Sequence, residues 1–239
     1  MNLLLLTPGE VTPGRVIELS GRRADHIFCV LHGKPGDMLR AGLLNGNLGN
    51  AEILESTRHR AVIRLGELDQ PPPAGWDFIP IIALPRPQSF KKTLHFIASS
   101  GIRKAIFTGA DKVEKSYWKS SAMTPQAIEE ELILGLEQGG TTIMPELIFR
   151  QSLRHFMMSE EFRTLTENGL KLIAHPRNVA PCPAQVHGKV ICAIGPEGGY
   201  RDEEVDAFVD AGFQSVEIGA HILRVEFALS CLYGRLVPF

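Results

Sequence analysis

The chain has 239 residues, of which 44% are hydrophobic and 22% are charged, and its formal net charge is −2. This composition is typical of a globular protein with one large domain or two ordinary ones. Its longest apolar runs are too short to span a bilayer, and the opening MNLLLL lacks the features of a signal peptide. The four cysteines do not follow a metal-ligand spacing. We therefore expect a cytoplasmic protein with no membrane partner and no metal site.

The first part of the chain predicts short strands separated by turns. KPGD and NGNLGN are turn sequences, and one helical piece is expected over residues 23–31. Strands are expected at residues 3–7, 15–19, 37–44, 50–56 and 60–65. Several short strands with little helix favour a small barrel or sandwich.

Three consecutive prolines at residues 71–73 mark the end of this part. Proline cannot join a sheet ladder, and it stiffens an extended linker. We therefore expect a first domain over residues 1–70, a linker over 71–77 and a second domain over 78–239.

The second part alternates strands with helices. Thr124 and Pro125 predict a helix start by capping and by a proline at the first helical position. Strands are expected at residues 78–84, 104–110, 146–149, 170–176, 189–195 and 215–219. Helices are expected at residues 89–101, 124–140, 152–168, 202–211 and 224–237. This alternation predicts a mostly parallel sheet covered on both faces.

Glycines follow two of the expected strands, in IGPEGG from Ile194 and IGAHIL from Ile218. Ligands of open α/β sheets bind outside the carboxyl ends of strands, where glycine lets the backbone approach them closely. An ordinary strand-to-helix turn is the alternative interpretation. The IGPEGG turn does not match the dinucleotide fingerprint, the phosphate-binding loop or the nucleophile elbow. A third strand end, LIAHP, also carries special residues.

These stretches resemble a known family. IGPEGGYRDEEV followed by IGAHILRVEFAL is similar to the signature of the RsmE family, the 16S rRNA uridine-N3 methyltransferases of the SPOUT class. HIFCVLHGKPGD and LEQGGTTIMPEL resemble two further segments of that family at matching distances. The chain departs from the family pattern at His32, Thr141, His221 and Phe227, and at SSG in place of E-L-G.

The resemblance implies an α/β fold with an N-terminal PUA-like β-barrel and a C-terminal SPOUT domain, whose parallel sheet carries a trefoil knot. It also implies a homodimer that binds S-adenosyl-L-methionine in a bent form and acts on 16S rRNA in the small ribosomal subunit. The residues expected to bind the cofactor lie in three loops: Ile173, Ala174 and His175; Ile194, Gly195, Pro196, Glu197, Gly198 and Gly199; Ile218, Gly219, Ile222 and Leu223.

Methylation of uridine N3 requires removal of its proton and stabilisation of the charge that develops on the base. Glu226 is the candidate proton acceptor and Arg224 the candidate cation. Glu197 is an alternative acceptor, although it can instead close its own turn. His175 and His221 are further acid–base candidates.

Basic residues gather between Leu84 and Lys119, and a local excess of positive charge suits the phosphates of RNA. A solvated helix face is the alternative interpretation. The RNA-binding candidates are Arg22, Arg23, Arg40, Arg86, Lys91, Lys92, Arg103 and Lys104. The other functions left open are a SPOUT enzyme with another RNA target, a donor-binding RNA-binding protein with weak catalysis, and a nucleotide-binding oxidoreductase.

Overall fold

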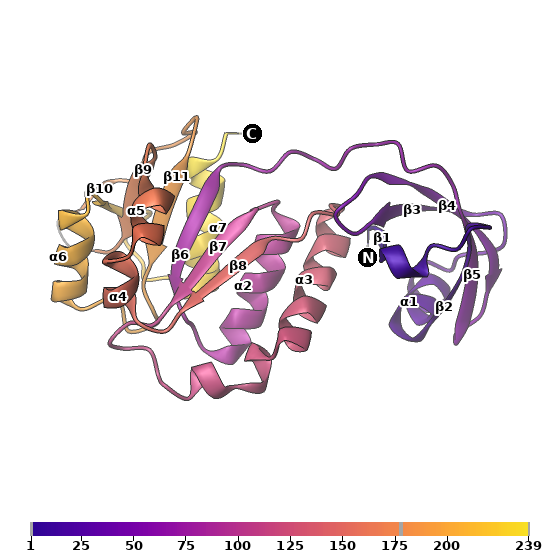
Figure 1. The fold of residues 1–239 in the computed structure, drawn as a ribbon, viewed down its shortest axis with the longest axis horizontal. Coiled ribbons are helices and arrows are strands. Elements are labelled where there is room, and N and C mark those ends of the chain that lie inside the picture. Colours follow the sequence, from indigo (N-terminus) through magenta and orange to yellow (C-terminus); the bar gives the residue numbers. More distant parts are fainter. Residues whose placement is uncertain (1, 177–178, 239) are drawn as a thin grey trace. The chain divides into compact units, whose positions relative to one another are not determined.

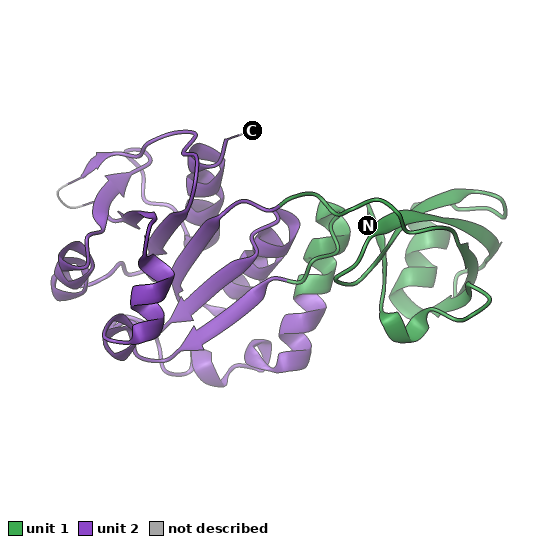
Figure 2. Ribbon diagram, turned by 45° about the horizontal axis from the view of Figure 1, so that its top comes forward, with its two compact units in different colours: residues 1–74, 132–144 green, residues 75–131, 145–239 purple. Residues whose placement is uncertain are grey.

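The protein is described by a computed structural model that covers residues 2–176 and 179–238. The chain packs as two compact units, coloured separately in Figure 2. Residues 1–74 and 132–144 form unit 1, and residues 75–131 and 145–239 form unit 2. These units are defined by packing alone. The domain boundaries expected from the sequence, at residues 70 and 78, therefore stay predictions.

Unit 1 is built on a curled five-stranded sheet in the order β1-β3-β4-β5-β2. The strands are β1 (Leu4–Leu6), β2 (Val16–Ser20), β3 (Met38–Leu43), β4 (Leu48–Ser56) and β5 (Arg60–Leu65). β1 pairs in parallel with β3, whereas the other neighbours are antiparallel. β1 and β2 are the two edges of this order, so the sheet is a half-barrel. Its concave side is filled by apolar side chains such as Leu6, Leu19, Ile53 and Ile63.

A short helical segment covers the half-barrel, as the sequence predicted for this region. It consists of α1 (Gly21–Asp25) and a π-helical turn (His26–Val30). Ala24 and Ile27 point into the core and are fully buried. Unit 1 therefore encloses its own apolar core.

Unit 2 contains a seven-stranded sheet in which every pairing is parallel (Figure 1). The order is β10-β12-β9-β11-β6-β7-β8. The strands are β6 (Phe78–Ala83), β7 (Lys104–Thr108), β8 (Glu146–Arg150), β9 (Leu170–Ala174), β10 (Ala180–Pro181), β11 (Val190–Ile194) and β12 (Gln214–Glu217). All their carboxyl ends therefore meet at one edge of the sheet.

Helices cover both faces of this sheet. One face packs on α4 (Leu153–Met157), α5 (Glu160–Thr166) and α6 (Asp202–Asp210) through a core that includes Ile106 and Phe208. The other face carries α2 (Pro87–Ser99) and α7 (Val225–Leu236), which pack against each other. Their rings meet the sheet in edge-to-face pairs: Phe90 on Phe107 at 4.9 Å and Tyr233 on Phe78 at 5.5 Å.

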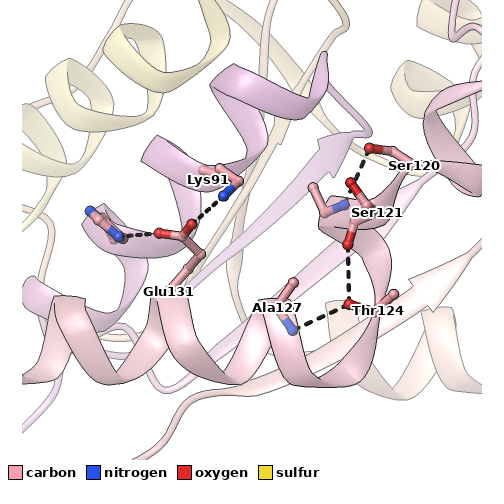
Figure 3. Close-up of polar contacts among 8 residues, drawn as sticks. Lys91, Ser120, Ser121, Thr124, Ala127 and Glu131 are labelled. Atoms are coloured by element: carbon pink, nitrogen blue, oxygen red, sulfur yellow. Dashed lines mark hydrogen bonds and ion pairs between the residues drawn. The ribbon is translucent and has the colours of Figure 1, made fainter. Parts of the chain in front are cut away.

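The predicted element types are confirmed with two exceptions. The helix expected over residues 152–168 is wrong in its continuity, because Ser159 takes an extended backbone and caps α5 by accepting a hydrogen bond from the Phe162 N–H at 3.2 Å. β10 was not predicted. Thr124 does cap α3 (Pro125–Gly139), since its hydroxyl accepts from the Ala127 N–H at 3.3 Å (Figure 3). The trefoil knot stays a prediction.

Candidate functional site

The structure brings the three predicted cofactor loops to one edge of unit 2. Ala174, the last residue of β9, lies opposite Ile194 at the end of β11 and opposite Val216 near the end of β12. These three strands are neighbours in the sheet and run in parallel. The loops that begin at their ends therefore emerge side by side, at the edge where α/β sheets bind their ligands.

The turn after β11 is tight and held from inside by Tyr200. The Tyr200 hydroxyl donates to the Ile194 carbonyl at 3.1 Å, and burial raises the pKa of this phenol, so it remains a donor. Gly199 closes the turn by donating its N–H to the Pro196 carbonyl at 2.7 Å. Its φ of +69° favours glycine. A Cβ on Gly195 would lie 3.1 Å from the Tyr200 nitrogen, so the packing leaves little room for a side chain there.

Residues that follow β6 and β7 hold the outer side of the same turn. The Arg86 N–H donates to a Glu197 carboxylate oxygen at 3.0 Å, and the guanidinium lies 3.7 Å from that oxygen. The Lys112 ammonium donates to the Gly198 carbonyl at 2.8 Å. Glu197 therefore fixes the shape of its own loop. From the sequence, Lys112 was only one of the basic residues between Leu84 and Lys119; its contact with this turn was not predicted, because only the fold brings the loop after β7 here.

A cavity of about 310 Å³ lies beside the end of β12. Ile218 and Gly219, both predicted to bind the cofactor, contribute to its wall. Cys182, Cys231 and Arg235 also line it, and no sequence pattern pointed to them. Gly219 has a φ of +155°, and a Cβ at this position would meet no atom within 4 Å. The backbone at Gly219 is therefore open to a ligand.

The other residues predicted to bind the cofactor range from buried to fully exposed. Ile173 and Pro196 are buried, and Ala174 and His175 are half-buried. Ile222 is 93% exposed, and Leu223 is also exposed. The structure thus gathers the three loops at one edge, but of these three only the loop after β12 lines the cavity.

The predicted catalytic residues stand at the start of α7 and differ sharply in exposure. Arg224 precedes the helix and is exposed, whereas Glu226 is only 4% exposed. Among the described residues neither Glu226 carboxylate oxygen has a hydrogen-bond partner, and the Lys92 ammonium lies 3.7 Å away. A buried carboxylate without hydrogen bonds is costly, which makes it a candidate for a functional role.

Glu226 and the cavity lie on different sides of α7. Successive residues of an α-helix are rotated by about 100°, so Cys231 is displaced by about 140° from Glu226 around the axis. Glu226 faces Lys92 of α2, whereas Cys231 and Arg235 face the cavity. One chain therefore does not place the predicted proton acceptor in the cavity wall.

The predicted RNA-binding residues are mostly engaged in ion pairs within their own unit. In unit 1, Arg22 pairs with Glu137 at 2.7 Å and Arg23 pairs with Glu10, while Arg40 is exposed. The Glu137 side chain is buried, so Arg22 compensates a carboxylate inside unit 1.

In unit 2, Figure 3 shows Lys91 of α2 reaching the Glu131 carboxylate of α3, at 2.6 Å. His95 contacts the second Glu131 oxygen at 2.6 Å. Burial of this carboxyl opposes its ionisation, but the hydrogen bonds from Lys91 and His95 outweigh burial and lower the pKa of Glu131. Lys104 pairs with Glu146 at 2.9 Å, and Arg103 is half-buried.

Residues 2–176 and 179–238 contain no group of three or more His, Cys, Asp or Glu side chains that can hold a metal ion. In the same residues no helix is both long and apolar enough to cross a membrane.

Comparison with known proteins then assigns the family. Residues 76–236 match the family model of the RNA methyltransferase domain. Ribosomal RNA small subunit methyltransferase E of Treponema pallidum is 31% identical over 232 residues, which cover 95% of this chain and 87% of that protein. The chain belongs to the RsmE family of ribosomal RNA methyltransferases.

A second RsmE-family sequence and two solved structures are also similar to this chain. Ribosomal RNA small subunit methyltransferase E 1 of Borreliella burgdorferi is 27% identical and covers 95% of this chain and 94% of its own length. A methyltransferase structure from Legionella pneumophila, bound to S-adenosylmethionine, matches with a TM-score of 0.74 and 25% identity, over 97% of this chain and 96% of that one. The enzyme from Neisseria gonorrhoeae, also bound to S-adenosylmethionine, shares the fold with a TM-score of 0.70 and 21% identity, over 97% and 95% of the two chains.

Proposed function

We propose that this protein is an S-adenosylmethionine-dependent methyltransferase that modifies N3 of a uridine in 16S rRNA of the small ribosomal subunit. One observation carries the proposal. The three loops predicted to bind the cofactor begin side by side at the carboxyl ends of β9, β11 and β12, next to a cavity. Membership of the RsmE family supports the reaction, and the target atom follows from the family resemblance. This substrate would place the activity in the cytoplasm.

The residues at this edge fit the proposed methyl donor. The cavity of about 310 Å³ falls at the lower end of the range for small-molecule pockets. The open backbone at Gly219 allows close approach of a ligand, and the turn from Ile194 to Gly199 is rigid enough to form a wall. We assign donor binding to the three loops from Ile173, Ile194 and Ile218.

S-adenosylmethionine supplies an activated methyl group on a sulfonium. The protein must hold uridine N3 in line with that group, which can lower the barrier by about 7–11 kcal/mol. Glu226 accepts the N3 proton in this proposal, since both its oxygens lack hydrogen bonds within the described chain. Lys92 compensates its charge. Arg224, exposed at the start of α7, stabilises negative charge on the base. The uridine must be unpaired or flipped out to reach this site.

We further propose that the protein acts as a homodimer. Phe227 is 52% exposed and Ile222 is 93% exposed, and both lie next to the proposed catalytic pair. We propose that they belong to one apolar patch, and apolar patches on a protein surface mark interaction sites. Because Glu226 and the cavity lie on different sides of α7, a second copy of the chain can combine the proton acceptor of one protomer with the cavity of the other.

Two measurements test the proposed function. Calorimetry with S-adenosylmethionine and with NAD separates a methyl donor site from a nucleotide-binding oxidoreductase. Transfer of tritiated methyl groups from S-adenosylmethionine to small ribosomal subunits, with tRNA as the competing substrate, then tests the RNA target. Donor binding with transfer to tRNA alone would contradict the 16S assignment. Donor binding with no transfer to either RNA would favour a weakly catalytic RNA-binding protein.

A further inference from the structure

A second cavity, of about 480 Å³, lies at the opposite edge of the unit 2 sheet from the proposed donor site. Phe78, Lys104 and Glu146 begin β6, β7 and β8, and all three line this cavity. The strands here have five or six residues, so the two edges are separated by about 16 Å. The cavity is therefore distinct from the site of proposed methyl transfer.

An indole and three cations surround this cavity. Trp76 lines the cavity and is 41% exposed, so part of its indole surface is open to a ligand there. Arg103, Lys104 and Lys189 line the cavity with it. The acidic side chains in the wall are Asp77 and Glu146, and Glu146 is paired with Lys104 at 2.9 Å. The cavity therefore has a net positive charge of one, with Phe78, Ile79 and Leu165 as its apolar surface.

The backbone on both sides of Trp76 is fixed to the sheet edge. A Cβ on Gly75 would lie 2.5 Å from the Gly101 carbonyl oxygen and 2.6 Å from the Arg103 Nε, so only glycine allows this close packing. On the other side, the Asp77 carbonyl accepts a hydrogen bond from the Val190 N–H at 2.8 Å. The indole is therefore presented to solvent from a rigid segment, which reduces the entropy lost when a ligand stacks on it.

Two of the cations, Arg103 and Lys189, can each contribute positive charge to a ligand. Burial lowers the pKa of Arg103, but a guanidinium remains charged in proteins. The Lys189 ammonium donates to the Glu167 carbonyl at 3.2 Å, which leaves two of its three protons for a ligand. A planar aromatic surface beside arginine and lysine is the combination that binds unpaired nucleotides, by base stacking and phosphate contact.

We infer that this cavity binds a nucleotide, with the base stacked on Trp76 and the phosphate held by Arg103 and Lys189. The nucleotide belongs to an unpaired segment of the RNA substrate, away from the methylated uridine, and in this respect the inference rests on the proposed function. From the sequence, Arg103 and Lys104 were expected only as part of a general basic surface. In the structure, Trp76 and Lys189 line the same cavity as these two residues, so the proposed RNA contact is confined to one cavity.

Tryptophan fluorescence tests this inference directly. The chain has two tryptophans, so Trp118→Phe leaves Trp76 as the single indole. Titration of that variant with a short oligouridylate should quench the Trp76 emission to saturation. In anisotropy measurements with labelled oligouridylate, Trp76→Ala should weaken binding at least tenfold, whereas Trp76→Phe should retain most of the affinity. Unchanged binding by Trp76→Ala, or no quenching, would overturn the inference.

Lysine variants test the phosphate contact. Lys189→Gln should reduce the slope of log affinity against log salt by about 0.7, the value for one phosphate contact on a single strand. Lys34→Gln, an exposed lysine outside the cavity, is the matched control and should leave the slope unchanged. An equal effect of both variants would contradict a localised site.

Uridine monophosphate distinguishes the two sources of a nucleotide. Quenching by the monophosphate at the same concentration as by oligouridylate would assign the cavity to free nucleotides and overturn the RNA assignment. Methyl transfer is measured separately on small ribosomal subunits. If the parent protein transfers methyl groups but its Trp76→Ala variant binds oligouridylate normally, the proposed activity stands and only the nucleotide site at Trp76 is refuted. Trp76-dependent binding without methyl transfer would contradict only the proposed activity.

Discussion

Gly219→Ala is the substitution that tests the proposed donor site most cleanly. The added methyl group meets no protein atom within 4 Å, so it projects into open space beside the cavity rather than into the core. It does strain the backbone, because φ at this position is +155°. Strain of this kind costs about 1–3 kcal/mol of stability. A loss of donor affinity must therefore be separated from a loss of stability.

Gly188→Ala provides the matched control. Gly188 has a φ of +99°, and a Cβ there also meets no atom within 4 Å, but it precedes β11 and lies at the other edge of the sheet. Both variants should unfold at lower denaturant concentration than the parent. Only Gly219→Ala should raise the dissociation constant of S-adenosylmethionine, by at least tenfold or about 1.4 kcal/mol in calorimetry. Equal donor affinity in the two variants would refute the assignment of the Gly219 loop.

Three other predictions concern the catalytic pair, the dimer and the pH dependence of stability. Glu226→Gln should lower methyl transfer to small ribosomal subunits about 100-fold or more, as expected for loss of a general base, with donor affinity unchanged in calorimetry. A variant with parental activity would remove Glu226 from the mechanism. Phe227→Asp should convert a dimer into a monomer of 26.3 kDa in sedimentation, whereas a monomeric parent would contradict the proposed interface. The pKa of Glu131 is lowered, so its stabilising effect should be full above its ordinary value of 4.5 and disappear as the pH falls through the folded-state pKa. Urea midpoints of the parent and Glu131→Gln should therefore differ at pH 7 and converge in acid; a constant difference would argue against this ion pair.

The alternation of strands and helices in unit 2 could be predicted because each element carries its own apolar period and its own turn signals. The gathering of the three loops could be predicted as well, since parallel strands end at one edge of a sheet. The break between α4 and α5 was missed because Ser159 stands in a run without proline or glycine, and its capping role depends on the local backbone.

Other features depend on contacts between distant segments, which local sequence does not encode. The parallel pairing of β1 with β3 joins residues that are far apart in the chain. Cys182 and Arg235 meet in one cavity only because α7 packs beside the end of β12, where the Arg235 Nε donates to the Cys182 carbonyl at 3.1 Å. The partnership of Lys92 with Glu226 likewise requires α2 and α7 to pack together. Lys92 was predicted only as a contact for RNA.

The central claim is methylation of uridine N3 in 16S rRNA, and mapping of modified nucleotides in rRNA from cells that lack this protein tests it most directly. We predict that one N3-methyluridine disappears from 16S rRNA, and that the gene restores it while the Glu226→Gln form does not. Retention of every N3-methyluridine in the 16S rRNA of the deficient cells, with loss of a methyl group from another RNA, would contradict the account.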